Sequence, residues 1–137
     1  MLAIRAATGD DLRAVVELWN TDGGPTRHAG QLAHAVALVD RDPEARLVAE
    51  LDGVLIGSLV AGWDGWRFHL YRLAIASSHR RRGVATALVA SAMKRAGALG
   101  AVRVDAMVHA GNVGAEYFWA SAGFDCGSED RRWSKVL

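Results

Sequence analysis

The sequence predicts a mixed α/β (α+β) domain with a sheet of about seven strands and four helices. Three observations support this prediction. The chain has 137 residues, 51% hydrophobic and 23% charged, which fits one globular domain over residues 1–137. Apolar residues recur at strand and helical spacing in the order β α α β β β α β α β β. An Asp-Gly pair at residues 52–53 separates two apolar runs, which is a strong hairpin signal.

The first third of the chain is expected to form one strand and two helices. Residues 2–8 (LAIRAAT) alternate weakly as a strand, and the acidic pair at residues 10–11 suits the positive end of a helix. Apolar residues then recur at helical spacing as far as Trp19. After a glycine-rich loop, residues 31–42 predict a second, short helix that ends before Pro43.

The middle of the chain predicts three successive strands and then a long helix. The strands are residues 45–51, 54–63 and 66–76, and the last is apolar enough to lie inside a sheet. Residues 77–89 (SSHRRRGVATALV) lead into the helix, whose apolar stripe ends at Gly97.

The last third predicts one strand, a short helix and two further strands. Residues 101–108 alternate, and the side chains expected on one face are Val102, Val104, Ala106 and Val108. A helix is expected from about residue 111 to 122, and strands at 124–128 and 131–137.

Composition excludes several classes of protein. The formal net charge is +1, which gives no global indication of nucleic-acid binding. Cys126 is the single cysteine, so an internal disulfide or a cysteine metal cluster is excluded, and we expect no metal. Neither a membrane-spanning apolar run nor a signal peptide is apparent, so we expect a cytoplasmic protein that does not bind membranes.

The three consecutive arginines, Arg80, Arg81 and Arg82, stand between a buried strand and an amphipathic helix. Free backbone N–H groups at a helix start, together with the helix dipole, form an anion site, and Gly83 lets a phosphate approach the backbone. The alternative is a solvated run of charge. ATP and NAD lose their main support because no G-x-x-x-x-G-K-[ST] or G-x-G-x-x-G motif is present.

Two motifs resemble those of the GNAT family of acyl-CoA-dependent N-acetyltransferases. RRRGVA, residues 80–85, matches the [QR]-x-x-G-x-[GA] signature, after a segment similar to the family's fourth strand. NVGAEYFWASAGF, residues 112–124, resembles N-x-x-A-x-x-F-Y-x-x-x-G-F. The resemblance implies a twisted, mostly antiparallel sheet splayed between strands 4 and 5, and a homodimer is a habit of the family.

The resemblance implies acetyl-CoA as co-substrate, with its pyrophosphate on the backbone amides of the loop in the 80s. In the family, the pantetheine arm runs along the fourth strand, so the thioester is expected near residue 69, about 20 Å from Ile75. The residues that this assigns to the cofactor are Leu73, Ala74, Ile75, Arg80, Arg81, Arg82, Gly83, Val84, Ala85, Thr86 and Asn112. Asn112 is also suited to cap the last helix.

His69 is the candidate general base. An amine with a pKa of around 10 is protonated at neutral pH, so transfer requires a proton acceptor. Strand alternation places His69 on the same face as Tyr71, Leu73 and Ile75, and its position matches one where some GNAT members carry a catalytic glutamate or histidine. A hydrogen-bonded core histidine is the alternative. Asp64 is a second candidate, acting through a water chain.

The general acid is less evident. The family's usual tyrosine is replaced by Trp119, whose indole does not transfer a proton at neutral pH and is expected to pack in the core. Tyr117 is the candidate acid, although two positions along a helix rotate it about 200° away. Water as the proton source, or a poor catalyst, are the alternatives.

We expect direct transfer to a primary amine of a small molecule or peptide. Acceptor contacts are expected from Asp22, Arg27, His28 and Gln31, or these form a solvated loop, and Trp63 and Trp66 either cover the acceptor or pack. Cys126 is not placed as a nucleophile. Two other functions fit the sequence: a non-catalytic acyl-CoA binding or regulatory module, and a nucleic-acid patch at the arginines, whose binding falls steeply with salt.

Overall fold

The computed structural model of the protein describes residues 1–22, 32–127 and 129–135. Within these residues it contains five strands, four α-helices and two 3₁₀ helices. The strands are β1 (Leu2–Ala6), β2 (Arg46–Leu51), β3 (Val54–Trp63), β4 (Phe68–Ile75) and β5 (Val104–Ala106). The helices are η1 (Gly9–Asp11), α1 (Leu12–Asp22), α2 (Leu32–Arg41), η2 (Ser77–His79), α3 (Val84–Ala98) and α4 (Val113–Ser121). The predicted mixed α/β order is confirmed from β1 to α4.

The five strands form one sheet in the order β1-β2-β3-β4-β5. The strands from β1 to β4 pair antiparallel, whereas β5 pairs parallel with β4 at Phe68–Leu70. Beyond Leu70, no strand of the described residues pairs with this edge of β4. The sheet is therefore mostly antiparallel and opens between β4 and β5, as the resemblance implied.

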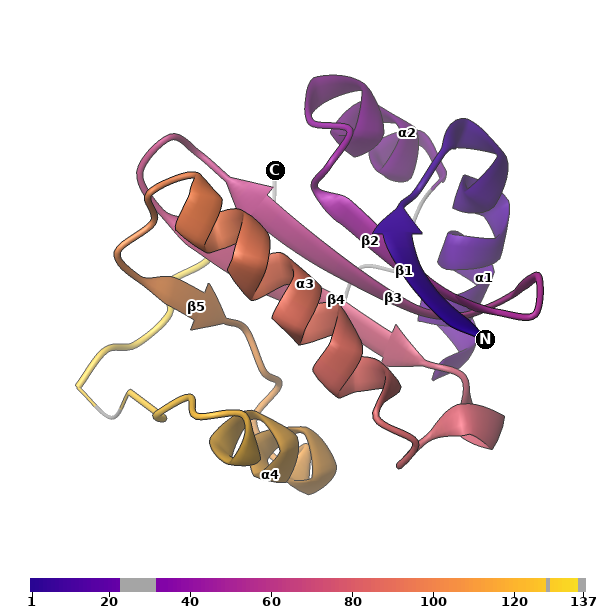
Figure 1. The fold of residues 1–137 in the computed structure, drawn as a ribbon. Coiled ribbons are helices and arrows are strands. Elements are labelled where there is room, and N and C mark those ends of the chain that lie inside the picture. The colour runs from indigo at the N-terminus through magenta and orange to yellow at the C-terminus, as the bar shows by residue number, and fades with distance from the viewer. Residues whose placement is uncertain (23–31, 128, 136–137) are drawn as a thin grey trace.

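Helices cover both faces of the sheet (Figure 1). On one face, α3 packs Leu88 against Leu59 of β3, and Trp119 of α4 belongs to the same core. On the other face, α1 packs Val15 against Val60 of β3, and α2 adds to that core. The longest described helix, α3, has 15 residues, and none of the described helices has the length and apolarity needed to cross a membrane.

A β-bulge interrupts β4 at Arg72. Tyr71 pairs with Val60 and Ala74 pairs with Ser58, so Leu59 lies opposite two residues of β4. Arg72 has a positive φ of 55°, which is uncommon for a residue other than glycine. The extra residue reverses the alternation of side chains along the strand.

The bulge corrects one prediction. His69 and Tyr71 share a face, but Leu73 and Ile75 point to the opposite face, where they pack against the core beneath α3. The expectation that all four side chains share one face is therefore wrong. Strict alternation fails because the bulge inserts one residue between Tyr71 and Leu73.

The two predicted C-terminal strands are also wrong. Among residues 124–127 and 129–135, none is in a strand, so the described sheet has five strands instead of seven. Phe124 packs its ring against Trp119 at 4.9 Å, but most of the segment is exposed, including Trp133 at 93%. The segment has no buried apolar face that would fix it against the sheet. Val102 likewise precedes β5 and is exposed.

A hydrogen-bonded network fixes the start of α1. Asp11 accepts hydrogen bonds from the backbone N–H of Thr8 at 2.7 Å and from its hydroxyl at 3.1 Å. The Arg5 guanidinium donates to Asp11 at 2.7 and 3.0 Å and to Glu50 of β2 at 3.0 Å. These contacts, led by Arg5, lower the pKa of Asp11 to about 2. They join β1, β2 and α1 at one corner.

Gly57 of β3 allows the start of α3 to lie close to the sheet. A Cβ at this position would be 3.0 Å from Ile75 Cδ1, 3.1 Å from Val84 Cγ1 and 3.2 Å from Leu88 Cδ1. The first turn of α3 is therefore held near the end of β4 because residue 57 has no side chain.

The first prediction concerns acid stability. The lowered pKa of Asp11 means that its stabilising contribution is present above the ordinary pKa of 3.8 and is lost as the pH falls through about 2. We expect Asp11→Asn to reduce the free energy of unfolding by about 1–2 kcal/mol at pH 7 and to flatten its decrease below pH 4. Urea unfolding at several pH values measures both. The control is Asp10→Asn, an exposed neighbour; an equal loss in the control would contradict the assignment.

The second prediction concerns Gly57. We expect Gly57→Ala to lower the free energy of unfolding by about 1 kcal/mol, because the new methyl group overpacks the contact between β3 and α3. Gly97→Ala on the exposed side of α3 is the control, since no atom lies within 4 Å of its Cβ position. The control is expected to gain up to about 1 kcal/mol from helix propensity. Thermal and urea unfolding compare the two, and a stabilised Gly57→Ala variant would show that the contact is not tight.

Candidate functional site

The start of α3 exposes backbone donors at the end of β4. Gly83 is the residue before the helix, with φ of 79°, and no side chain caps the helix start. The first backbone bond of the helix runs from Ala87 N–H to the Gly83 carbonyl, so the amides of Val84, Ala85 and Thr86 have no acceptor within the helix. These amides, together with the helix dipole, form a site suited to an anion.

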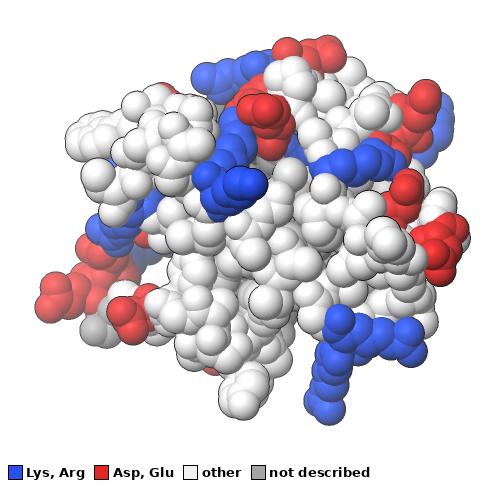
Figure 2. All heavy atoms as spheres, in the orientation of Figure 1, with Lys and Arg blue, Asp and Glu red and all other residues white. Residues whose placement is uncertain are grey.

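The backbone before the helix widens this site. Arg81 has a positive φ of 61°, and a Cβ on Gly83 would have no atom within 4 Å. Arg80, Arg81 and Arg82 are exposed. Figure 2 shows positive side chains gathered at the corner where α3 begins. Open space above Gly83 leaves room for a group to approach the amides.

Arg80 also reaches across to α1. Its guanidinium lies 3.9 Å from the Asp22 carboxylate and 3.5 Å from the Asp22 carbonyl oxygen. Asp22, predicted to contact the acceptor, is thus drawn toward the arginine loop. Arg27, His28 and Gln31, predicted with it, lie outside the described residues.

The second half of β4 presents main-chain groups at the open edge of the sheet. The Ala76 N–H donates to the Ile56 carbonyl at 2.8 Å, so this residue and Ala74 direct their main-chain groups toward β3. By alternation, the N–H and C=O groups of Leu73 and Ile75 point to the other edge, where β5 has diverged. An extended molecule is able to hydrogen-bond there as an additional strand does.

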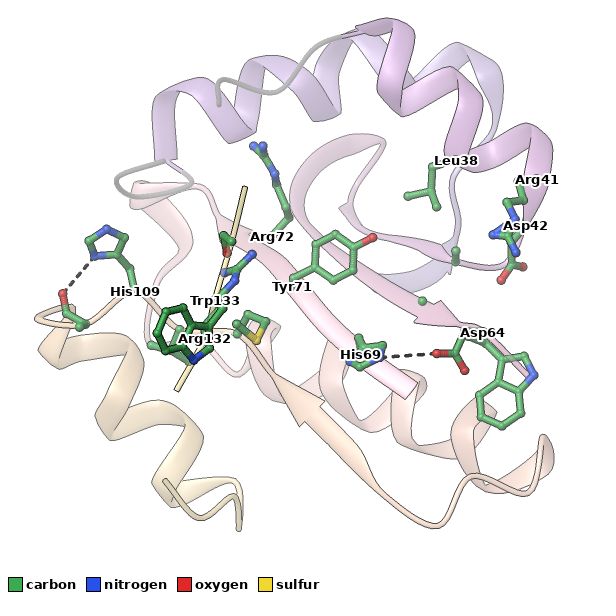
Figure 3. Close-up of a pocket in the computed structure, with 17 residues that line it drawn as sticks. Leu38, Arg41, Asp42, Asp64, His69, Tyr71, Arg72, His109, Arg132 and Trp133 are labelled. Atoms are coloured by element: carbon green, nitrogen blue, oxygen red, sulfur yellow. Dashed lines mark hydrogen bonds and ion pairs between the residues drawn. The ribbon is translucent and has the colours of Figure 1, made fainter. Parts of the chain in front are cut away.

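A cleft of about 1300 Å³ opens on the side of the sheet that carries His69 (Figure 3). Its wall is formed by the end of α2, the loop between β3 and β4, the first half of β4, and the segments after β5 and before the C-terminus. The lining residues used below are Asp42, Asp64, His69, Tyr71, Arg72 and Trp133. The volume is sufficient for a small-molecule or peptide ligand.

His69 lies between two carboxylates. Its Nε2 is 3.9 Å from Asp64 Oδ2, and its Nδ1 is 4.0 Å from Asp105 Oδ2 on the paired strand β5. Asp64 Oδ1 accepts hydrogen bonds from the backbone N–H groups of Arg67 at 2.6 Å and Trp66 at 2.8 Å. These bonds, Arg67 first, lower the pKa of Asp64. The imidazole is therefore a partly exposed group in the cleft rather than a core residue.

The residues of α4 have different environments. Trp119 is buried and packs edge-on against Phe118 and Phe124, which confirms its predicted place in the core. Asn112 accepts a hydrogen bond from the Ala115 N–H at 3.2 Å, which confirms its predicted role as a helix cap. Tyr117 is 79% exposed and does not line the cleft described above.

The two tryptophans of the β3–β4 region differ. Trp63 lines the cleft and packs its ring 6.1 Å from that of Phe68, so it does both of the things proposed for it. Trp66 is 71% exposed and carries the Arg67 guanidinium over its ring at 5.0 Å. Cys126 is exposed in the C-terminal segment.

Sequence reasoning missed three features of the site. Asp105 adjoins His69 only because β5 pairs with β4 in parallel register, which no local motif reports. Tyr71 and Arg72 line the cleft at the bulge, but only the alternation of apolar residues was considered there. An Asp in an otherwise apolar strand, next to a parallel partner, is the signal that pointed to Asp105.

Comparisons with known proteins agree with this geometry. The sequence matches the profile of the acetyltransferase (GNAT) family over residues 12–124. Acetyltransferase ECA0875 of Pectobacterium atrosepticum is 33% identical over 88 residues, which are 64% of this chain and 62% of that protein. The chain is thus matched to less than two thirds of the length of this relative.

Solved structures share the fold. Ard1 from Thermoplasma volcanium superposes with a TM-score of 0.83 at 21% identity, over 93% of this chain and 84% of that chain. Diaminobutyrate acetyltransferase EctA from Paenibacillus lautus, in complex with L-2,4-diaminobutyric acid and coenzyme A, has a TM-score of 0.76 at 24% identity, over 88% of this chain and 74% of that chain. The profile match covers most of the sequence, and the chain belongs to the acetyltransferase (GNAT) family.

Proposed function

We propose that this protein transfers the acetyl group of acetyl-CoA directly to a primary amine of a small molecule or peptide. The observation that carries the proposal is the uncapped start of α3, with a left-handed Gly83, at the end of a strand whose outer edge is open. Family membership supports the same activity.

The residues at the start of α3 fit a diphosphate. The amides of Val84, Ala85 and Thr86 would hold it, the space above Gly83 would admit it, and Arg80, Arg81 and Arg82 would add positive charge. The main-chain groups of Leu73, Ala74 and Ile75 would hold the pantetheine arm along β4. Asn112, whose side chain already caps α4, would contact it less directly.

Acetyl-CoA supplies an acyl group activated as a thioester. His69 holds the acceptor amine and takes its proton, since the imidazole is exposed in the cleft beside two carboxylates. Asp105 orients the ring from β5, and Asp64 holds the other nitrogen or relays the proton through water. Binding the amine between these groups positions it for attack.

The proton for the leaving thiolate has two candidate sources. The side chain of Tyr117 is 79% exposed, and the Trp119 indole is buried and is not an acid at neutral pH. Water therefore fits better than Tyr117 as the proton source. A thiol pKa near 8.5 makes thiolate a tolerable leaving group, so a dedicated acid is not essential.

A prediction tests the site at α3. We expect Gly83→Val to weaken CoA binding by at least about 100-fold, because a β-branched side chain disfavours φ of 79° and covers the amides. Isothermal titration calorimetry measures the affinity. Gly53→Val is the matched control, since Gly53 also has a positive φ of 84° and open space but lies in the β2–β3 turn. Equal affinity in the Gly83→Val variant, or equal loss in the control, would count against the proposed site.

A second prediction tests the base. We expect His69→Gln to lower kcat/KM by about 10²- to 10⁴-fold, with the larger loss below pH 8, where less acceptor amine is deprotonated. Release of CoA with a panel of primary amines measures the rate. A pH–rate profile that does not change would remove His69 from the mechanism. Tight CoA binding without turnover of any amine would instead indicate a non-catalytic acyl-CoA module.

A further inference from the structure

Arg46 is a buried arginine beneath α1 that the proposed mechanism does not use. It is 1% exposed at the start of β2 and stacks its guanidinium 4.3 Å from the centroid of the Trp19 ring. Burial lowers the pKa of Arg46 to about 10. A guanidinium in this position is charged and surrounded by apolar side chains, which is costly without a compensating partner.

Unsatisfied polar atoms gather around this arginine. In the described part of the chain, five buried side-chain atoms lack a hydrogen-bond partner. Four of them are Trp19 Nε1, Arg46 Nε, Arg46 Nη1 and Ser58 Oγ. Ser58 pairs with Val48, two residues from Arg46, so its hydroxyl lies on the same face. Buried donors are normally paired, so this cluster requires an explanation.

No carboxylate neutralises Arg46. Within the described residues, its guanidinium forms no ion pair with an Asp or Glu. Residues 23–31, which follow α1, contain neither Asp nor Glu. The positive charge beneath Trp19 is therefore in excess.

Arg72 links this charge to the cleft. Its guanidinium lies 4.8 Å from the centroid of the same Trp19 ring, and the residue lines the cleft. Figure 3 shows Arg72 directed toward the helices, away from His69 and Asp64, with Tyr71 between the two ends. The cleft thus has an arginine end, backed by Arg46, and a histidine end.

The carboxylates of the cleft are already engaged. Both oxygens of Asp42 accept from Arg95 Nη2, at 3.0 and 2.8 Å. Asp64 is held by two backbone amides and lies beside His69. Neither is available to balance the arginine end, so an anionic group of a ligand would find uncompensated positive charge there.

We propose that the acceptor carries an anionic group, a carboxylate or phosphate, which binds at Arg72 and Arg46 while its amine lies at His69. The proposal rests on the acetyltransferase function proposed above. His69 and Arg72 are three positions apart on β4, or about 10 Å. The anionic group is therefore several bonds from the amine, which favours an ω-amino acid, an acidic peptide or an amino phosphate over a simple polyamine.

The first arm of the test measures acceptor preference with the full chain. We use 6-aminohexanoate and its neutral counterpart 6-aminohexanamide, which have the same length and amine. The expected kcat/KM is at least about 10-fold higher for the carboxylate, as for a charge-assisted bidentate contact. Arg72→Gln is expected to abolish this preference and Arg72→Lys to retain part of it. Equal rates with the two acceptors, or a preference that survives Arg72→Gln, would overturn the proposal.

The second arm does not depend on turnover. Glutarate, a dicarboxylate without an amine, is expected to raise the Tm of the wild-type protein by a few °C at concentrations well above its Kd. The shift is expected to disappear in Arg72→Gln and in Arg46→Met, and to remain in Arg13→Gln, which removes an exposed charge from α1. Absence of a shift in the wild type, or an undiminished shift in Arg72→Gln, would overturn the anion site.

The two arms separate the proposals. If no amine is acetylated but glutarate stabilises the protein through Arg72, the acetyltransferase function fails and the anion site stands. If neutral amines are acetylated as fast as the carboxylate, the function stands and the anion site fails. Arg46→Met adds a second criterion, because it removes an uncompensated buried charge: its Tm without glutarate is expected to equal or exceed that of the wild type. A large fall in Tm would show that Arg46 is structural.

Discussion

The bulge at Arg72 is the constraint on which the site depends. Before it, β4 pairs on both edges and turns His69 and Tyr71 toward the cleft. After it, the strand turns Leu73 and Ile75 into the core beneath α3, and its outer edge is left open by the divergence of β5. One inserted residue thus divides the strand into a half that faces an acceptor and a half that offers main-chain hydrogen bonds.

The start of α3 completes this arrangement because it lies against the second half of β4. Gly57 admits the helix close to the sheet, so the free amides and Gly83 are positioned at the point where the open edge ends. The anion site, the open edge and the cleft therefore follow one strand in sequence. Elongated ligands with a charged end are the molecules that such a path accommodates.

How much the sequence predicts depends on whether the signal is local. The start of α3 was predictable because glycine, arginines and an apolar strand stand together in the chain. The place of Asp105 beside His69 was not, since it depends on the register of a parallel pair far apart in sequence. The bulge carries no glycine, so alternation misplaced Leu73 and Ile75. The C-terminal residues have strand-forming side chains but no buried face, and strand propensity alone misassigned them.

The most direct test of the central claim is a crystal structure of the protein grown with CoA. The account predicts electron density for the diphosphate against the backbone amides at the start of α3, with the pantetheine arm along β4 and the thiol directed toward His69. Density for the nucleotide at another surface, with the amides of Val84, Ala85 and Thr86 bound only to water, would contradict it.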